Sequence, residues 1–268
     1  MVSRRLDVTD VRKKLTDLPK ATELFDEVYA FYADTLRFLG NESGTVSTYR
    51  FDTDAEHLRF RSVTIELALN TDRLPAAVTH ELFHLRLRIL GYPQIRSFAL
   101  DVLTARIGSD LAETFNRLLN VVDHDIFVGD FLDAGLPLSQ FLGAPASPKS
   151  NYKAQWREMQ RNPTPPELMF VWWNWWTLEY LRHLISREHG SDVATAAAEQ
   201  VEKWGARALP GFQKETAKIR DWIKAGNHKN PQSYPGALRQ LASLMRLPNP
   251  SFLLVEKAGS EISLRAID

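Results

Sequence analysis

Three residues near position 80 have the types and the spacing of a metal-dependent hydrolytic site. His80 and His84 lie four positions apart, and Glu81 directly follows the first histidine in the stretch THELFHLRL. On a helix, residues four apart lie on the same face, so both imidazoles can bind one metal ion. Glu81 lies about 100° farther round the helix, where its carboxylate can take a proton from a metal-activated water. The spacing therefore predicts a hydrolytic zinc site with Glu81 as general base.

The surrounding sequence predicts a buried helix for these residues. Pro75 is typical of the first turn of a helix, and Gly91 followed by Pro93 is typical of an end, so we expect a helix over 75–90. Nearly all other residues of this segment are apolar, which is the pattern of a helix buried on every side. Buried His and Glu side chains need partners, and a metal ion with its water would supply them. The alternative is a pair of core histidines that are hydrogen-bonded to protein.

The rest of the chain predicts an α+β fold that is mostly helical, with a small antiparallel sheet packed beside the buried helix. We expect one domain over 1–268, with a strand-containing N-terminal lobe (about 1–135) and a helical C-terminal lobe (about 150–268). The segment 143–166 reads as a connection or a lid around one short helix. Expected helices are 7–18, 21–39, 110–132, 151–161, 166–189, 192–208, 213–225 and 234–246, and expected hairpins are 45–69 and 251–267.

Composition excludes several classes of function. The 268 residues include no cysteine, so any metal must be held by His, Asp or Glu. The 33 basic and 33 acidic residues balance, which predicts neither nucleic acid nor a membrane surface as partner. The chain has no signal-peptide pattern and no apolar run of membrane-spanning length, so we expect a cytoplasmic protein. The oligomeric state is open.

VTHELFHLRL resembles the active-site helix of the zincin metallopeptidases, and the order of SVTIELALN before this helix is similar to theirs. The resemblance covers about residues 45–132. LRLRILGYPQI supplies no third histidine at the metzincin position, so the chain is similar to the gluzincin type, which implies a third ligand on a later helix. We expect Asp123 in this role. His124 and Glu113 are the alternatives, either as ligand or, for His124, as oxyanion stabiliser.

The resemblance implies a metallopeptidase that binds Zn²⁺ through His80, His84 and Asp123 and cleaves a peptide or protein substrate. The alternative is a metal-binding or regulatory protein that keeps the fold without activity. Two other features carry weaker expectations. The aromatic run FVWWNWWTLEYLRHL reads as core packing, and Tyr152 is a loose candidate for stabilising a transition state. The remaining histidines (His57, His183, His189 and His228) are expected at the surface or at helix caps.

Overall fold

A computed structural model describes residues 4–42, 47–54, 59–69, 73–98, 105–141, 151–161 and 169–267. The chain forms two compact units. Unit 1 comprises Met1–Gln94, Phe127–Gly143 and Leu253–Asp268, and unit 2 comprises Ile95–Ile126 and Ala144–Phe252. Helix α4 (Ala105–Asp133) is continuous and contributes to both units. The assignment of a single domain with two lobes stays a prediction.

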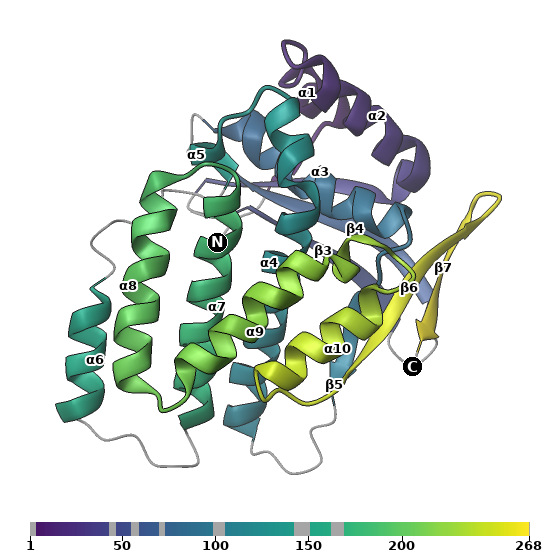
Figure 1. The fold of residues 1–268 in the computed structure, drawn as a ribbon. Coiled ribbons are helices and arrows are strands. Elements are labelled where there is room, and N and C mark those ends of the chain that lie inside the picture. The colour runs from purple at the N-terminus through teal and green to yellow at the C-terminus, as the bar shows by residue number, and fades with distance from the viewer. Residues whose placement is uncertain are drawn as a thin grey trace. The chain divides into compact units, whose positions relative to one another are not determined.

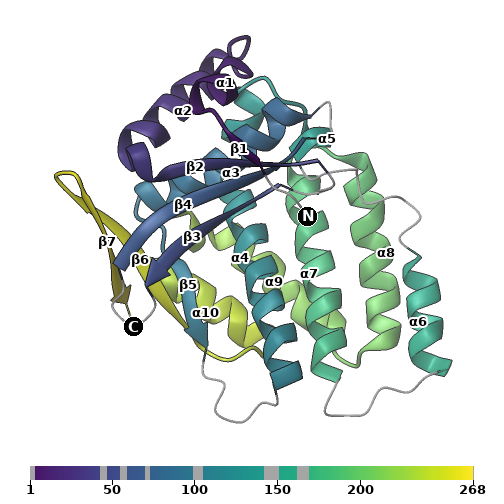
Figure 2. The ribbon, with the colours of Figure 1, turned by 180° about the vertical axis from the view of Figure 1, so that it is seen from behind.

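Unit 1 is built on a mixed sheet (Figure 2). Strand β4 (Arg59–Ala68) pairs in parallel with β2 (Leu36–Asn41) and antiparallel with β3 (Thr48–Asp54), and β1 (Arg4–Leu6) extends the β2 side antiparallel. At Arg59, β4 also pairs with Ser263 of β7 (Glu261–Ile267), which forms the C-terminal hairpin with β6 (Pro250–Ala258). Strand β5 (Gln94–Phe98) adjoins β6 in the strand order. The two predicted hairpins are confirmed by β3–β4 and β6–β7.

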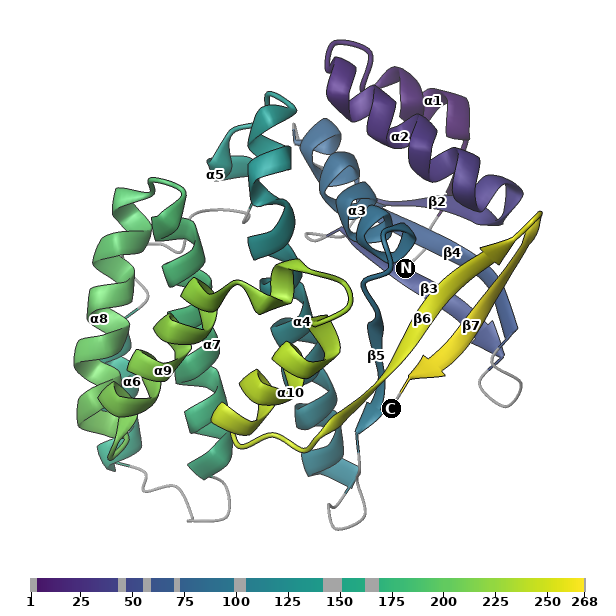
Figure 3. The same ribbon diagram turned by 45° about the vertical axis from the view of Figure 1, so that its right-hand side comes forward.

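Two long helices of unit 1 lie side by side and pack onto this sheet (Figure 3). They are α2 (Pro19–Tyr32) and α3 (Leu74–Ile89), and α3 also packs against β4. Phe25 of α2 stacks on Phe38 of β2 with ring centroids 5.8 Å apart, and both side chains are buried. Short helices α1 (Val8–Lys13), η1 (Ala33–Thr35) and α5 (Leu138–Phe141) complete the unit.

The helix expected over 21–39 is wrong in its second half. It ends at Tyr32, and residues 36–41 form β2. Ala33 has φ 45°, a backbone conformation that stops a helix, and Leu36 and Phe38 are then buried with Arg37 exposed between them. The alternation of buried and exposed side chains comes from parallel pairing with residues 63–68. This long-range contact cannot be predicted from the local sequence.

Unit 2 consists mainly of helices, and α6, α7 and α8 lie alongside one another in Figure 1. Its aromatic core is formed from α7, where Trp176 and Tyr180 are almost fully buried and contact Phe212. The prediction of core packing for the aromatic run is therefore confirmed. The helices are α6 (Tyr152–Arg161), α7 (Met169–Glu188), α8 (Asp192–Ala208), α9 (Phe212–Ala225), η3 (Asn227–Lys229) and α10 (Tyr234–Leu244).

The expected fold class, a mostly helical α+β protein, is confirmed, with one parallel strand pair in addition to the antiparallel ones. Helix α4 begins at Ala105, so the expected start near Asp110 is wrong. Within 143–166 the short helix is confirmed as α6, whereas the rest of that segment and residues 55–58 of the expected hairpin 45–69 lie outside the described residues. No helix in the described part of the chain has the length and hydropathy needed to cross a membrane.

Candidate metal centre

The helix that carries the HExxH motif is fixed at both ends. Pro75 lies in its first turn, and Gly91 beyond its end has φ 88°, the left-handed conformation that terminates a helix. The amide of Tyr92 donates to the Leu87 carbonyl, and the buried guanidinium of Arg88 donates to the carbonyls of Tyr92 and Pro93. The predicted boundaries of this helix are therefore confirmed to within one residue.

The motif residues lie on the buried side of α3. His84 and Glu81 are 2% and 4% exposed, and the side chain of His80 is 16% exposed. The two imidazole centroids are 4.9 Å apart, as the spacing of four predicts. His80 Nδ1 lies 3.1 Å from Glu81 Oε1. If Nδ1 carries the proton, it donates to the carboxylate, and Nε2 keeps a lone pair for a metal ion.

Aromatic rings of unit 1 surround the two imidazoles. Phe127 contacts both, with centroid distances of 5.7 Å to His80 and 4.9 Å to His84. Phe141 lies 5.3 Å from His80, and Tyr49 of β3 stacks on His84 at 5.4 Å. These rings limit the rotation of the imidazoles and keep the local dielectric low, which strengthens any charge interaction within the site.

Helix α4 brings a third histidine to this group. His124 lies three residues before Phe127 on the same continuous helix, so both side chains share one face. His80, His84 and His124 each offer one ligand atom, and these atoms lie within 4.8 Å of one another. Within the described residues, this is the group of at least three His, Asp or Glu side chains that can hold a metal ion. His124 is 7% exposed and thus buried.

The donor set fits zinc chemically. Three imidazoles plus a water are a known ligand set of catalytic zinc, with Zn–N distances of about 2.0–2.1 Å and nitrogens about 3.4 Å apart in tetrahedral geometry. From separations of up to 4.8 Å, the imidazole nitrogens reach that geometry by moving about 1 Å or less. The three converging imidazoles and the carboxylate beside them therefore suit a metal ion.

The other two candidate ligands have different surroundings. Asp123 is fully buried in unit 2, where its Oδ1 accepts a hydrogen bond of 2.7 Å from the Tyr234 hydroxyl. Glu113 is exposed and pairs with Arg117 one turn along α4, at 2.5 Å. Neither belongs to the group of converging ligand atoms in the described part of the chain.

A second buried carboxylate follows His124 directly. Asp125 Oδ2 lies 2.6 Å from His228 Nε2 and 3.1 Å from Lys229 Nζ. Burial alone would raise the pKa of Asp125, but the hydrogen bond from His228 and the charge of Lys229 hold this pKa below its usual range. His228 is itself fully buried and stacks on Trp222, so the expected surface position for His228 is wrong. Segment 227–234 thus holds α4 at the residues on both sides of His124.

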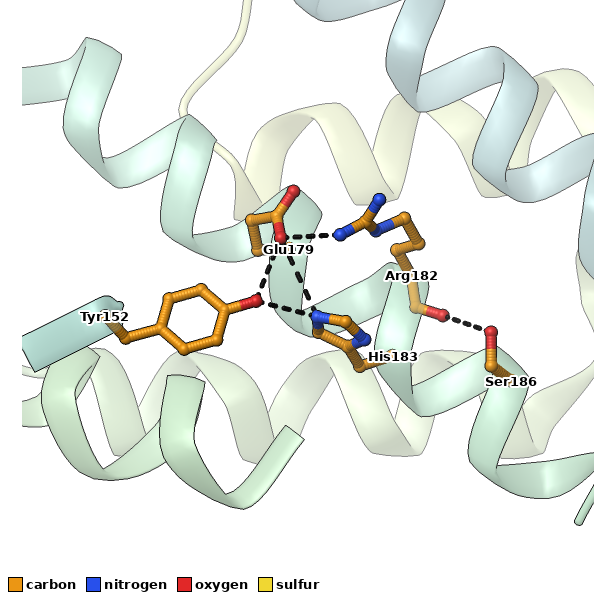
Figure 4. Close-up of polar contacts among 5 residues, drawn as sticks. All are labelled: Tyr152, Glu179, Arg182, His183 and Ser186. Carbon is orange, nitrogen blue, oxygen red and sulfur yellow. Dashed lines mark hydrogen bonds and ion pairs between the residues drawn. The ribbon is translucent and has the colours of Figure 1, made fainter. Parts of the chain in front are cut away.

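Tyr152 belongs to a polar cluster within unit 2 (Figure 4). Its hydroxyl lies 3.0 Å from Glu179 Oε2 and 2.7 Å from His183 Nε2, and Arg182 donates to the same carboxylate oxygen at 2.8 Å. Burial raises the pKa of Glu179, but the bonds from His183 and Tyr152 and the charge of Arg182 outweigh it and lower this pKa. His183 is 3% exposed, so its expected surface position is also wrong. The cluster ties α6 to α7.

Sequence reasoning had no signal for the residues that surround the site. Phe141, Tyr234 and His228 lie 17 to 110 positions from His124 in the sequence, and none matches a ligand spacing. Comparisons with protein-family models, with curated proteins and with solved structures found no match for this chain.

Proposed function

We propose that this protein is a zinc-dependent hydrolase of the zincin type that cleaves peptide bonds. The observation that carries the proposal is the convergence of three histidines, two of them buried, beside Glu81. In this proposal His80, His84 and His124 hold the metal, so the third ligand is His124 and Asp123 supports α4 beside it. When bound, zinc supplies a Lewis acid that lowers the pKa of a coordinated water to near neutrality.

Glu81 performs the proton transfers in this proposal. Its carboxylate is buried and adjoins His80, so it lies within reach of a water that attacks a substrate carbonyl. Glu81 accepts the proton of that water and then gives it to the leaving amine. The phenyl rings of Phe127 and Phe141 keep bulk water from the imidazoles, which strengthens the electrostatic contribution of the site.

Substitution of Glu81 tests the proposal. Glu81→Gln keeps the size of the side chain but cannot accept a proton, so we expect stoichiometric zinc by elemental analysis and loss of hydrolysis of an internally quenched peptide library. General-base catalysis contributes about 10²–10⁴-fold, which sets the expected loss. Glu113→Gln is the matched control, since Glu113 is exposed and outside the ligand group.

The outcomes separate the proposed enzyme from its alternative. Purified wild-type protein without zinc would refute the metal site. Zinc without any hydrolysis in the wild type would favour a metal-binding or regulatory protein. Full hydrolysis by Glu81→Gln would show that this carboxylate is not the base.

A further inference from the structure

Three cations of unit 2 converge on one tryptophan. Lys203 Nζ and Lys153 Nζ lie 5.7 Å from the ring centroid of Trp204, and Arg207 Cζ lies 4.7 Å from it. The three charges therefore lie at most about 11 Å from one another, so salt at about 0.15 M, with a Debye length of about 8 Å, screens their repulsion only in part. Because Lys203 and Arg207 are on α8 and Lys153 is on α6, this cluster joins two helices that pack together.

The same exposed surface of α6 carries two further cations. Arg157 and Arg161 follow Lys153 at intervals of four, so the three side chains follow one face of α6 over about 12 Å. We call Lys153, Arg157, Arg161, Lys203 and Arg207 the basic surface; all five are exposed. None of them has an ion pair with an acidic side chain in the described part of the chain.

The concentration of positive charge is a local property of this surface. The whole chain has a formal net charge of zero, so these five cations form a local excess, and none has an acidic partner among the residues that the structure describes. Glu202 of α8, which directly precedes Lys203 in the sequence, forms its ion pair with Arg220 at 3.0 Å instead. Like charges at this separation repel, and an anionic partner would remove that repulsion.

The surroundings of the basic surface fit an acidic peptide better than a nucleic acid. Trp204 is only 7% exposed and packs on Trp156, so its ring is not available to stack with a base. A hollow of about 520 Å³ beside Lys203 and Arg207 is also lined by Glu199 and Glu202. These carboxylates would repel every unit of a continuous phosphodiester, whereas a peptide with spaced acidic residues can place its neutral backbone amides beside them, where the carboxylates accept hydrogen bonds.

We propose that the basic surface binds an acidic segment of another protein. An extended peptide covers the 12 Å from Lys153 to Arg161 in about four residues, so carboxylates on alternate residues can meet successive cations. This interaction goes beyond the proposed hydrolysis and does not depend on it, because every residue involved lies in unit 2 and outside the metal centre.

Fluorescence anisotropy with a labelled peptide of alternating Glu and Ser, about twelve residues long, tests the proposal on the full chain. We expect saturable binding at about 50 mM NaCl that weakens at least about tenfold at about 300 mM. The double variant Lys153→Glu with Arg207→Glu should weaken binding at least about tenfold. Lys14→Glu with Lys224→Glu changes the net charge equally at exposed positions elsewhere and should stay within about twofold.

A second double variant controls for possible misfolding of the first. Lys153→Gln with Arg207→Gln removes the two charges without adding repulsion, and it should weaken binding about threefold while the melting temperature stays that of the wild type. Absence of binding to the wild type, or equal weakening by the control pair, would overturn the proposal. Tighter binding of a thymidine oligonucleotide of the same length would overturn the choice of a peptide partner.

Discussion

The identity of the third metal ligand is tested by one pair of substitutions, His124→Asn and Asp123→Asn. The apparent binding free energy of a structural zinc site, about 10–16 kcal/mol over four ligands, gives roughly 3 kcal/mol for each. Loss of one imidazole therefore corresponds to about a 100-fold weaker zinc affinity. The Asp123→Asn variant keeps an oxygen that can accept the 2.7 Å hydrogen bond from the Tyr234 hydroxyl, so the zinc affinity of this variant should differ from that of the wild type by less than about threefold.

Zinc affinity can be measured by competition with a fluorescent chelator, and thermal unfolding gives an independent readout. At a free zinc concentration about 100 times the Kd, binding stabilises the folded protein by about 2.7 kcal/mol. For a chain of this size that corresponds to a rise in Tm of about 5–11 °C over the metal-free protein. We expect His124→Asn to lose most of this rise and Asp123→Asn to keep it.

The melting temperature in the presence of a chelator is the control, because it reports folding without metal. His124→Asn should melt within a few degrees of metal-free wild type. The reverse pattern, in which Asp123→Asn abolishes zinc binding while His124→Asn binds as tightly as the wild type, would refute the reasoning from convergent ligand atoms and restore Asp123 as the ligand.

Three further predictions concern the packing of unit 2. Tyr152→Phe removes the hydroxyl that contacts Glu179 and His183, and should cost about 2 kcal/mol by urea unfolding near neutral pH. Because the pKa of Glu179 is lowered in the folded protein, the ionised carboxylate contributes fully to the stability of the fold above the unfolded pKa of about 4.3. This contribution is lost as the pH falls through the lower folded pKa, so the stability cost of Tyr152→Phe should shrink in the same pH range. A cost that does not change with pH would contradict this origin. His228→Asn breaks the buried pair with Asp125 and should destabilise the protein by about 3–5 kcal/mol; a loss below about 1 kcal/mol would show that Lys229 alone holds the carboxylate. At Gly205 an added Cβ would overlap the Phe212 ring, so Gly205→Ala should cost about 1–3 kcal/mol. In α10 the added Cβ of Gly236→Ala meets nothing within 4 Å, so this control should stabilise the protein by about 0.5–1 kcal/mol. Equal effects of the two substitutions in calorimetry would refute the packing of α8 on α9.

Local sequence was sufficient for the helix of the motif. Pro75, Gly91 and the apolar residues between them act within a few positions, so both the boundaries and the burial of α3 follow from them. The spacing of His80 and His84 then places their imidazoles together, because the geometry of a helix is the same wherever it forms.

The surroundings of the motif were decided by the tertiary structure. A single sequence does not show that Phe127 would pack on both imidazoles and thereby turn His124 toward them, since that depends on how α4 lies along α3. For the same reason the partners of Asp123 and Asp125, more than 100 positions away, were beyond prediction. The sequence did not predict strand β2, because its extended conformation is stabilised by pairing with β4 and not by the preferences of its own residues.

What the sequence determined by itself is the chemistry of the donors: two histidines and a glutamate on one buried helix, in a chain without cysteine. The tertiary structure decided which further side chain joins them and which buried carboxylates support it. The physical reason is that ligand type and helical spacing are local properties, whereas the convergence of ligands from two helices is set by long-range packing.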